Sequence, residues 1–169
     1  PGTGHRGDAP PDGPGPRAGV TMAKLVLIGA LALAPLPAAA VTVTGCTDLA
    51  NVWAVAEPWE ANTRLFANGE IRLVVLDTVE PAAAAFHLVV LHPPRDELGL
   101  PMCSMVSAAE GLGFGGMDLG PAAAAYDPAR GLTVALPIST YDPDSASFFD
   151  RSLSVTINQA SGQIEAVTE

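Results

Sequence analysis

Two histidines and two methionines near the middle of the chain are the residues best suited to chemistry. His87 and His92 bracket an apolar run, and Met102 and Met105 follow on either side of Cys103. Imidazole nitrogen and thioether sulfur are ligands for soft metal ions such as copper. His87 and His92 are five positions apart, so on a strand they point to opposite faces and cannot hold one metal ion by themselves.

A periplasmic copper carrier is therefore one hypothesis, in which one histidine pairs with one methionine from a neighbouring strand. Met102 and Met105 are three positions apart, so they too lie on opposite faces of a strand. The simpler interpretation is that Met105 packs in the core and His92 is exposed to solvent. We expect no bound metal ion and no cofactor, and the candidate ligands remain His87, His92, Met102 and Met105.

Catalytic constellations are not recognisable in the sequence. There is no G-x-S-x-G motif, and both histidines lie within or beside an apolar segment. Asp142, Asp144 and Asp150 gather in YDPDSASFFD, where carboxylates suit acid–base chemistry or calcium binding. Their spacing matches no recognised calcium loop, and the stretch is typical of a loop. We predict that the protein is not an enzyme.

A glycine-rich segment, Gly111 to Gly116, formally matches the G-x-G-x-x-G pattern of dinucleotide-binding folds. That function requires a strand before the glycines and a long helix after them. Gly120-Pro121 arrives too soon for such a helix. We interpret the segment as a connection or bulge.

The first 40 residues carry targeting information. Residues 1–21 are rich in Gly and Pro, which predicts disorder, and we expect them to precede the true start of the protein. Residues 22–40, MAKLVLIGALALAPLPAAA, have one Lys, an apolar run and an Ala-x-Ala end, the layout of a secretory signal peptide. The run is shorter than the roughly 20 residues of a spanning helix. We predict export to the periplasm, with residues 41–169 as a single β domain.

Two cysteines, Cys46 and Cys103, remain after the signal peptide, and an even number in an exported chain is typical of a disulfide. Closing such a loop stabilises a fold by roughly 4 kcal/mol. Alternatively, Val43-Thr44-Gly45-Cys46 is similar to the lipobox of bacterial lipoproteins. In lipoproteins the apolar run usually meets the cysteine directly, which it does not here, and acylation leaves Cys103 unpaired. We predict the disulfide; the alternative is a membrane anchor at Cys46.

The net charge restricts the class of partner. Residues 41–169 contain 5 Arg, no Lys and 16 acidic residues, which gives a net charge of −11. Phosphate binding needs clustered Lys and Arg, so this balance excludes a nucleic-acid-binding protein. An acidic surface suits solubility and favours a basic partner.

The residues discussed above lie within or between short apolar segments that are separated by turn signals, and these segments are predicted to be the strands that position them. In the segment EIRLVVLD (70–77), Ile71, Leu73 and Val75 share one face, whereas AFHLVVL (85–91) is apolar nearly throughout, which predicts burial on both faces. Further strands are predicted at 102–108, 122–125, 132–138, 153–157 and 163–168. Seven or eight short strands indicate a mainly all-β fold, a small antiparallel β-sandwich or barrel.

Three local features are also predicted. Asn68-Gly69 is typical of a two-residue hairpin turn. Pro137 lacks a backbone donor, so its strand should end there or lie at an edge. A short N-terminal helix is favoured after Cys46, with Thr47 as its cap and Pro58 as its end.

The stretch from about Cys46 to Glu169 resembles short exported proteins of unknown function from high-GC proteobacteria. The residues that carry the resemblance are AEPWEANTRLFANG, AAYDPARGLTV and VTINQASG. The resemblance implies export and a compact β domain, and no known activity comes with it. We predict a non-catalytic binding or accessory module of the bacterial envelope, with an envelope protein, favoured to be basic, as its partner.

Overall fold

The computed structural model describes residues 41–169 and, before them, only positions 1, 2, 4, 7, 13 and 15. The predicted signal peptide at 22–40 lies outside the described residues, as does most of 1–21.

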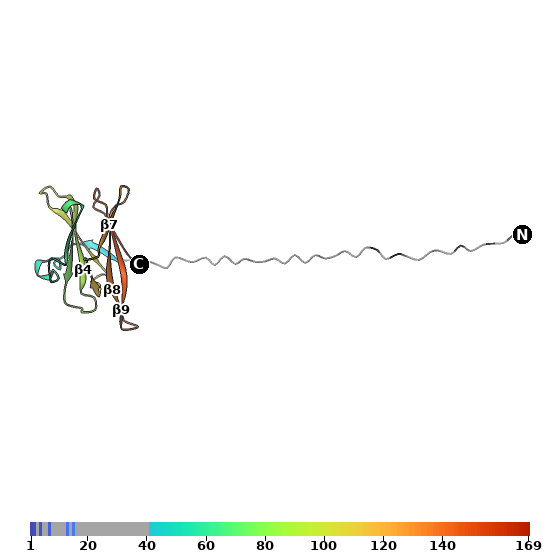
Figure 1. Ribbon diagram of the computed structural model, residues 1–169, viewed down its shortest axis with the longest axis horizontal. Helices are drawn as coiled ribbons and strands as arrows, with labels where there is room; N and C mark the ends of the chain where they lie inside the picture. Colours follow the sequence, from blue (N-terminus) through green and yellow to red (C-terminus); the bar gives the residue numbers. More distant parts are fainter. Residues whose placement is uncertain (3, 5–6, 8–12, 14, 16–40) are drawn as a thin grey trace. The chain divides into compact units, whose positions relative to one another are not determined.

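Two antiparallel five-stranded sheets face each other, seen in Figure 1 as a green layer that contains β4 and an orange layer that contains β8. The first sheet has the order β1-β5-β4-β3-β2; the second has β10-β9-β8-β6, with β7 also paired to β8. The strands are β1 (Thr42–Gly45), β2 (Thr63–Phe66), β3 (Ile71–Asp77), β4 (Phe86–Arg95), β5 (Pro101–Ser107), β6 (Gly116–Met117), β7 (Ala123–Asp127), β8 (Gly131–Asp142), β9 (Ser147–Ile157) and β10 (Ile164–Thr168). The prediction of a β-sandwich is confirmed, whereas residues 41–169 do not close into a barrel and form ten strands rather than seven or eight.

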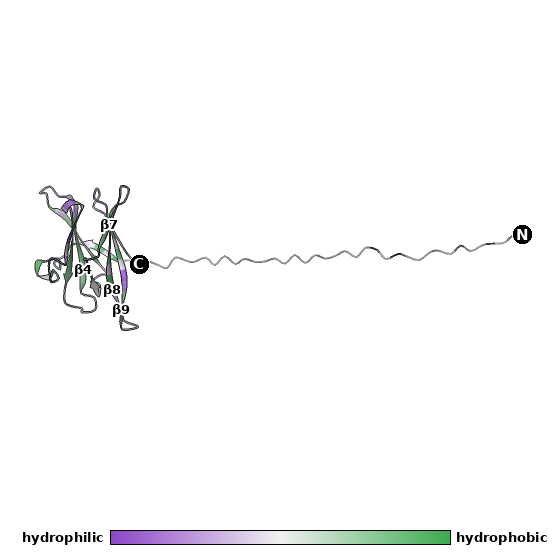
Figure 2. Ribbon diagram, viewed as in Figure 1, coloured by the Kyte–Doolittle hydropathy of each residue, from purple (hydrophilic) through white to green (hydrophobic). Residues whose placement is uncertain are grey.

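The main core lies between the two sheets and follows from the alternation of apolar residues. Ile71, Leu73 and Val75 of β3 are fully buried on one face, as predicted, and pack with alternate residues of β8 and β9. Figure 2 shows hydrophobic residues concentrated along the central strands β4 and β8. Burial of this continuous apolar layer is the main contribution to the stability of the sandwich.

The outer face of the first sheet has a cover of its own, the segment 46–62. Figure 1 shows this teal segment outside the green sheet, on the side away from the orange sheet. Ala54 of the segment packs with Leu76, Val89 and Met105 in a second, smaller cluster of buried residues. β4 is therefore buried on both faces, as its continuous apolar sequence predicts, and the prediction of core packing for Met105 is confirmed.

The helix predicted after Cys46 is only a single 3-10 turn, η1 (Val52–Ala54). Its cap is Asn51 rather than Thr47, because the Asn51 side chain accepts a hydrogen bond from Ala54 N at 3.1 Å. Ala54 is buried but Trp53 is 85% exposed, so the segment has only a narrow apolar face. A longer amphipathic helix would have no second row of residues to bury.

The predicted β2–β3 hairpin is present, but its turn is longer than the predicted two residues. Phe66 pairs with Ile71, so four residues connect the strands, three of them in the 3-10 turn η2 (Ala67–Gly69). Asn68 and Gly69 take left-handed conformations as expected, with φ of 56° and 92°. Ala67 is left-handed too, with φ of 50°, so the reversal begins one residue earlier than the Asn-Gly pair indicates.

Pro137 neither ends its strand nor lies at an edge, contrary to the sequence-based prediction. β8 continues to Asp142, and Pro137 pairs with Ser152 of β9. On its other side β8 pairs with β7 up to Ala135 and with β6 from Ile138 onward. The Pro137 carbonyl faces that side, because it accepts from Asp118 N at 3.2 Å. The Pro137 nitrogen, which has no N–H, therefore faces the gap between β6 and β7. No strand pairs with β8 at this position, so no ladder hydrogen bond is lost.

Replacing Gly131 with alanine is expected to lower the free energy of unfolding by about 3 kcal/mol. Gly131 has φ of 108°, and a Cβ there would overlap the Ile157 carbonyl oxygen and lie 3.0 Å from Asn158 Cα. Gly69→Ala is the matched control, because φ is 92° but no atom lies within 4 Å of the added Cβ. Urea unfolding should show a loss of only about 1 kcal/mol for the control. Equal losses in the two variants would contradict the close approach of Gly131 to β9.

Candidate functional site

Cys46 and Cys103 form the predicted disulfide, with their Cα atoms 5.4 Å apart. It joins the end of β1 to β5, and Cys46 N also donates a hydrogen bond to the Cys103 carbonyl at 3.2 Å. A disulfide indicates an oxidising compartment, as expected for an exported protein. With its sulfur in this bond, Cys46 cannot carry a thioether-linked lipid at the same time.

His92 is fully buried, so the prediction that it is exposed is wrong. Its Nδ1 donates to the Pro93 carbonyl at 2.7 Å, since a carbonyl can only accept. Its Nε2 lies 3.0 Å from Ser104 Oγ. Both ring nitrogens therefore have hydrogen-bond partners within the protein, and neither is left for a ligand.

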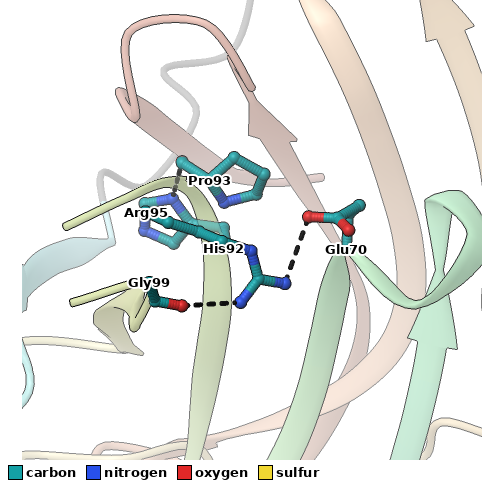
Figure 3. A network of polar contacts seen from close by, with 5 residues as sticks. All are labelled: Glu70, His92, Pro93, Arg95 and Gly99. Carbon is teal, nitrogen blue, oxygen red and sulfur yellow. Dashed lines mark hydrogen bonds and ion pairs between the residues drawn. The ribbon is translucent and has the colours of Figure 1, made fainter. Parts of the chain in front are cut away.

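Arg95 lies beside His92 at the end of β4 and keeps its charge at the surface. Its guanidinium donates to Glu70 Oε2 at 3.2 Å and to the Gly99 carbonyl at 3.0 Å, as Figure 3 shows. The Arg95 and Glu70 side chains are about half exposed, and an ion pair of this kind contributes at most about 1 kcal/mol. This end of the sandwich therefore offers a structural network rather than an open site.

His87 lies on the opposite face of β4 from His92, as the five-residue spacing predicts, and is only 3% exposed. Its Nδ1 is 2.8 Å from Ser107 Oγ, and Nε2 has no partner among the described residues. Burial lowers the pKa of His87 below its ordinary value of 6.5, because the charged ring loses contact with water. The imidazole is therefore neutral at pH 7.

The His87 cavity is a hollow of about 230 Å³ on the outer face of the first sheet. Its walls are β1, β5, the start of segment 46–62 and the loop after β5. The lining residues are Thr42, Thr44, Thr47, Leu49, His87, Met105, Ser107, Ala109, Glu110 and Gly111. Of the candidate ligands, His87 and Met105 thus meet in one cavity, whereas His92 lies on the other face and Met102 packs against Gly162 at the far end of β5. Sequence reasoning did not single out Ser107 or Glu110.

A second hollow, which we call the end groove, lies at the end of the sandwich where three loops converge. It has a volume of about 310 Å³ and a predominantly apolar lining. The loops are those between β3 and β4, between β5 and β6, and between β8 and β9. Its lining residues are Pro81, Ala83, Ala84, Ala108, Ala109, Leu112, Gly113, Thr140, Tyr141 and Pro143.

The glycine-rich segment 111–116 builds one wall of the end groove, which explains its composition. Phe114 pairs with Phe86 through two backbone hydrogen bonds, of 2.6 and 3.0 Å. A Cβ on Gly113 would overlap the Phe86 carbonyl, and a Cβ on Gly115 would overlap the Phe148 ring. These glycines thus allow the backbone to approach its neighbours closely, and the segment is a connection, as predicted.

The aromatic residues of YDPDSASFFD are at the surface beside this groove. The segment is a β8–β9 hairpin rather than a long loop, and Phe148 and Phe149 belong to β9. The Tyr141 and Phe148 rings pair across the two strands with centroids 5.2 Å apart. They are 40% and 53% exposed, so they form a half-exposed aromatic rim.

The loops that build the end groove carry only acidic charges. Together with the strand ends that flank them, these loops span 77–85, 108–116 and 139–150 and contain no Lys, Arg or His. The first basic residue beyond them is Arg151, whose guanidinium lies 5.6 Å from the centre of the Phe149 ring. Glu80, Glu110, Asp142 and Asp144 directly adjoin lining residues in the sequence. Hydrogen bonds from Ser145 and from Asp144 N lower the pKa of Asp142, which therefore stays ionised at pH 7.

The three clustered aspartates do not form one site. Asp142 is used by the hairpin turn, and Asp150 lies opposite Ser139, three positions along β8 from Asp142 and about 10 Å away by strand geometry. Within the described residues, no group of three or more His, Cys, Asp and Glu side chains is placed to hold a metal ion.

The fold, the disulfide and the end groove define the class of protein as a disulfide-closed β-sandwich with a loop-built groove at one end. No protein-family model, curated protein or solved structure matches the chain. In the part of the chain that the structure describes, no helix has the length and apolar character to cross a membrane.

Proposed function

We propose that this protein is an exported, non-catalytic binding module of the bacterial envelope, and that its end groove binds an apolar segment of a basic partner protein. The observation that carries the proposal is the coincidence of an apolar hollow with a rim of one charge sign. An apolar side chain gains from leaving water in such a hollow, and flanking Lys or Arg side chains on the partner meet carboxylates.

The disulfide supports the proposed periplasmic location, because such bonds persist in oxidising compartments. The charge of −11 on residues 41–169 supports a basic partner, since it would attract one over a distance of about 10 Å at 0.1 M salt.

Random 12-residue peptides displayed on phage provide a direct test, because they sample apolar and charged side chains without assuming a partner. We expect the protein to select peptides with an apolar centre flanked by Lys or Arg. Leu112→Ser should weaken the binding of a selected peptide by about tenfold, since Leu112 is the largest aliphatic residue of the groove. Asp144→Asn should weaken it by up to about fivefold at low salt and have no effect in 0.5 M NaCl.

Matched controls come from the loop between β4 and β5, at the opposite end of β5. Leu98→Ser removes another exposed leucine, and Glu97→Gln removes another exposed carboxylate. Neither should change peptide binding. Selected peptides without basic residues, or equal losses in the Leu98 and Leu112 variants, would contradict the proposal.

A further inference from the structure

His87 and Met105 present two soft donors to one cavity on the outer face of the first sheet. Val89 of β4 pairs with Met105 of β5, so Met105 lies diagonally across from His87. Diagonal neighbours on one face of an antiparallel pair have Cα atoms roughly 7–8 Å apart, within reach of long side chains. Both residues line the cavity.

The hydrogen bond between His87 and Ser107 fixes the orientation of the imidazole ring. When Nδ1 donates to Ser107 Oγ, at 2.8 Å, the Nε2 lone pair is left free, and Nε2 has no partner in residues 41–169. Histidines that bind metals usually donate their other nitrogen to a fixed partner in this way. No buried side-chain nitrogen or oxygen of the described residues lacks a hydrogen-bond partner, so Nε2 is open to the cavity rather than sealed in the core, and a ligand in the cavity can reach it.

We propose that the His87 cavity binds one Cu(I) ion, with His87 Nε2 and Met105 Sδ as its ligands. Thioether sulfur and imidazole nitrogen together select a soft ion such as Cu(I) over Mg²⁺ or Ca²⁺. Glu110, an exposed carboxylate in the cavity lining, attracts the cation electrostatically. This inference does not rest on the end groove, because its two ligands, His87 and Met105, do not line that groove, although Ala109 lines both hollows.

The four candidate ligands of the sequence thus reduce to two. His92 has both nitrogens bonded, to Pro93 and Ser104. Met102 is 43% exposed at the other end of β5, away from the His87 cavity. Met102 is therefore the natural control for Met105, since the two methionines belong to the same strand.

The test is an anaerobic titration of the disulfide-intact protein with Cu(I), added as its acetonitrile complex, in competition with a chromophoric Cu(I) chelator. We expect one ion per chain, bound more tightly than micromolar. His87→Gln should weaken binding on the order of 100-fold and Met105→Leu about tenfold, whereas Met102→Leu should leave it unchanged. Ser107→Ala, which removes only the positioning hydroxyl, should weaken binding about tenfold.

NMR of the unsubstituted protein gives a second readout that does not depend on the folding of any variant. Addition of Cu(I) should shift the His87 ring and Met105 methyl resonances and leave those of His92 and Met102 in place. Binding no tighter than micromolar would overturn the proposal. Shifts at His92 and Met102 instead, or a loss of affinity in Met102→Leu equal to that in Met105→Leu, would also overturn it.

Discussion

Removing the Cys46–Cys103 disulfide, as the double variant Cys46→Ser/Cys103→Ser, is expected to lower the free energy of unfolding by about 4 kcal/mol. The bond closes a loop with a sequence separation of 57, so the unfolded chain gains much conformational freedom when it is lost. In the folded state the bond holds segment 46–62 against the second cluster around Met105. Urea unfolding at pH 7 measures the loss directly.

Chemical reduction of the unsubstituted protein is the control for the two serine side chains. Reduction should reproduce most of the loss, and the two samples should unfold at similar urea concentrations. A double variant that unfolds within 1 kcal/mol of the oxidised protein would contradict the expectation. It would mean that the cover segment is held by its apolar contacts alone.

Phe114→Ala is expected to destabilise the fold by about 3–5 kcal/mol. The Phe114 side chain is fully buried in the main core, and its truncation leaves a cavity between the sheets. Its backbone also pairs with Phe86. Loosening this pairing should disturb one wall of the end groove, so peptide binding should weaken together with stability.

Leu112→Ala is the matched control for Phe114→Ala. Leu112 lies two residues away in the same loop but is 47% exposed, so its truncation should cost less than about 1 kcal/mol. Thermal and urea unfolding of the two variants can be compared side by side. If both lost the same free energy, Phe114 would not anchor the loop as its burial indicates.

The sequence predicted the parts of the fold in which the burial pattern lies within one segment. The alternation of apolar residues predicts the shared face of β3, and the continuous apolar run predicts the double burial of β4, because successive side chains of a strand point to opposite faces. Pro137 shows the limit of such reasoning. Its strand changes partners from β7 to β6, and this change depends on residues far away in the chain.

The candidate ligands illustrate the same limit. Alternation separates His87 from His92 and Met102 from Met105, but the pairing of β4 with β5 decides which histidine meets which methionine. The register of β4 against β5 depends on how the chain turns in HPPRDELG. The structure has an irregularity there, between His92 and Arg95, which shifts the pairing and which the sequence does not indicate. Burial of His92 likewise depends on Ser104, which no local pattern links to it.

The end groove is harder still to predict from the sequence than the candidate ligands. Its lining consists largely of alanine, glycine and proline from three separate loops, and small residues are common in connections of any kind. The glycine-rich segment 111–116 formally matches a nucleotide-binding motif. The structure assigns Gly113 and Gly115 to close contacts with Phe86 and Phe148 instead.

The disulfide also makes a closed covalent ring that contains β2, β3, β4 and the first residues of β5. A protease that cuts once inside this ring opens it without separating the chain into two molecules. The two new ends stay joined through sulfur, and the first sheet keeps all of its strands. Wherever the disulfide persists, as it does in an oxidising compartment, the ring therefore lets the protein remain one molecule after a single proteolytic cut.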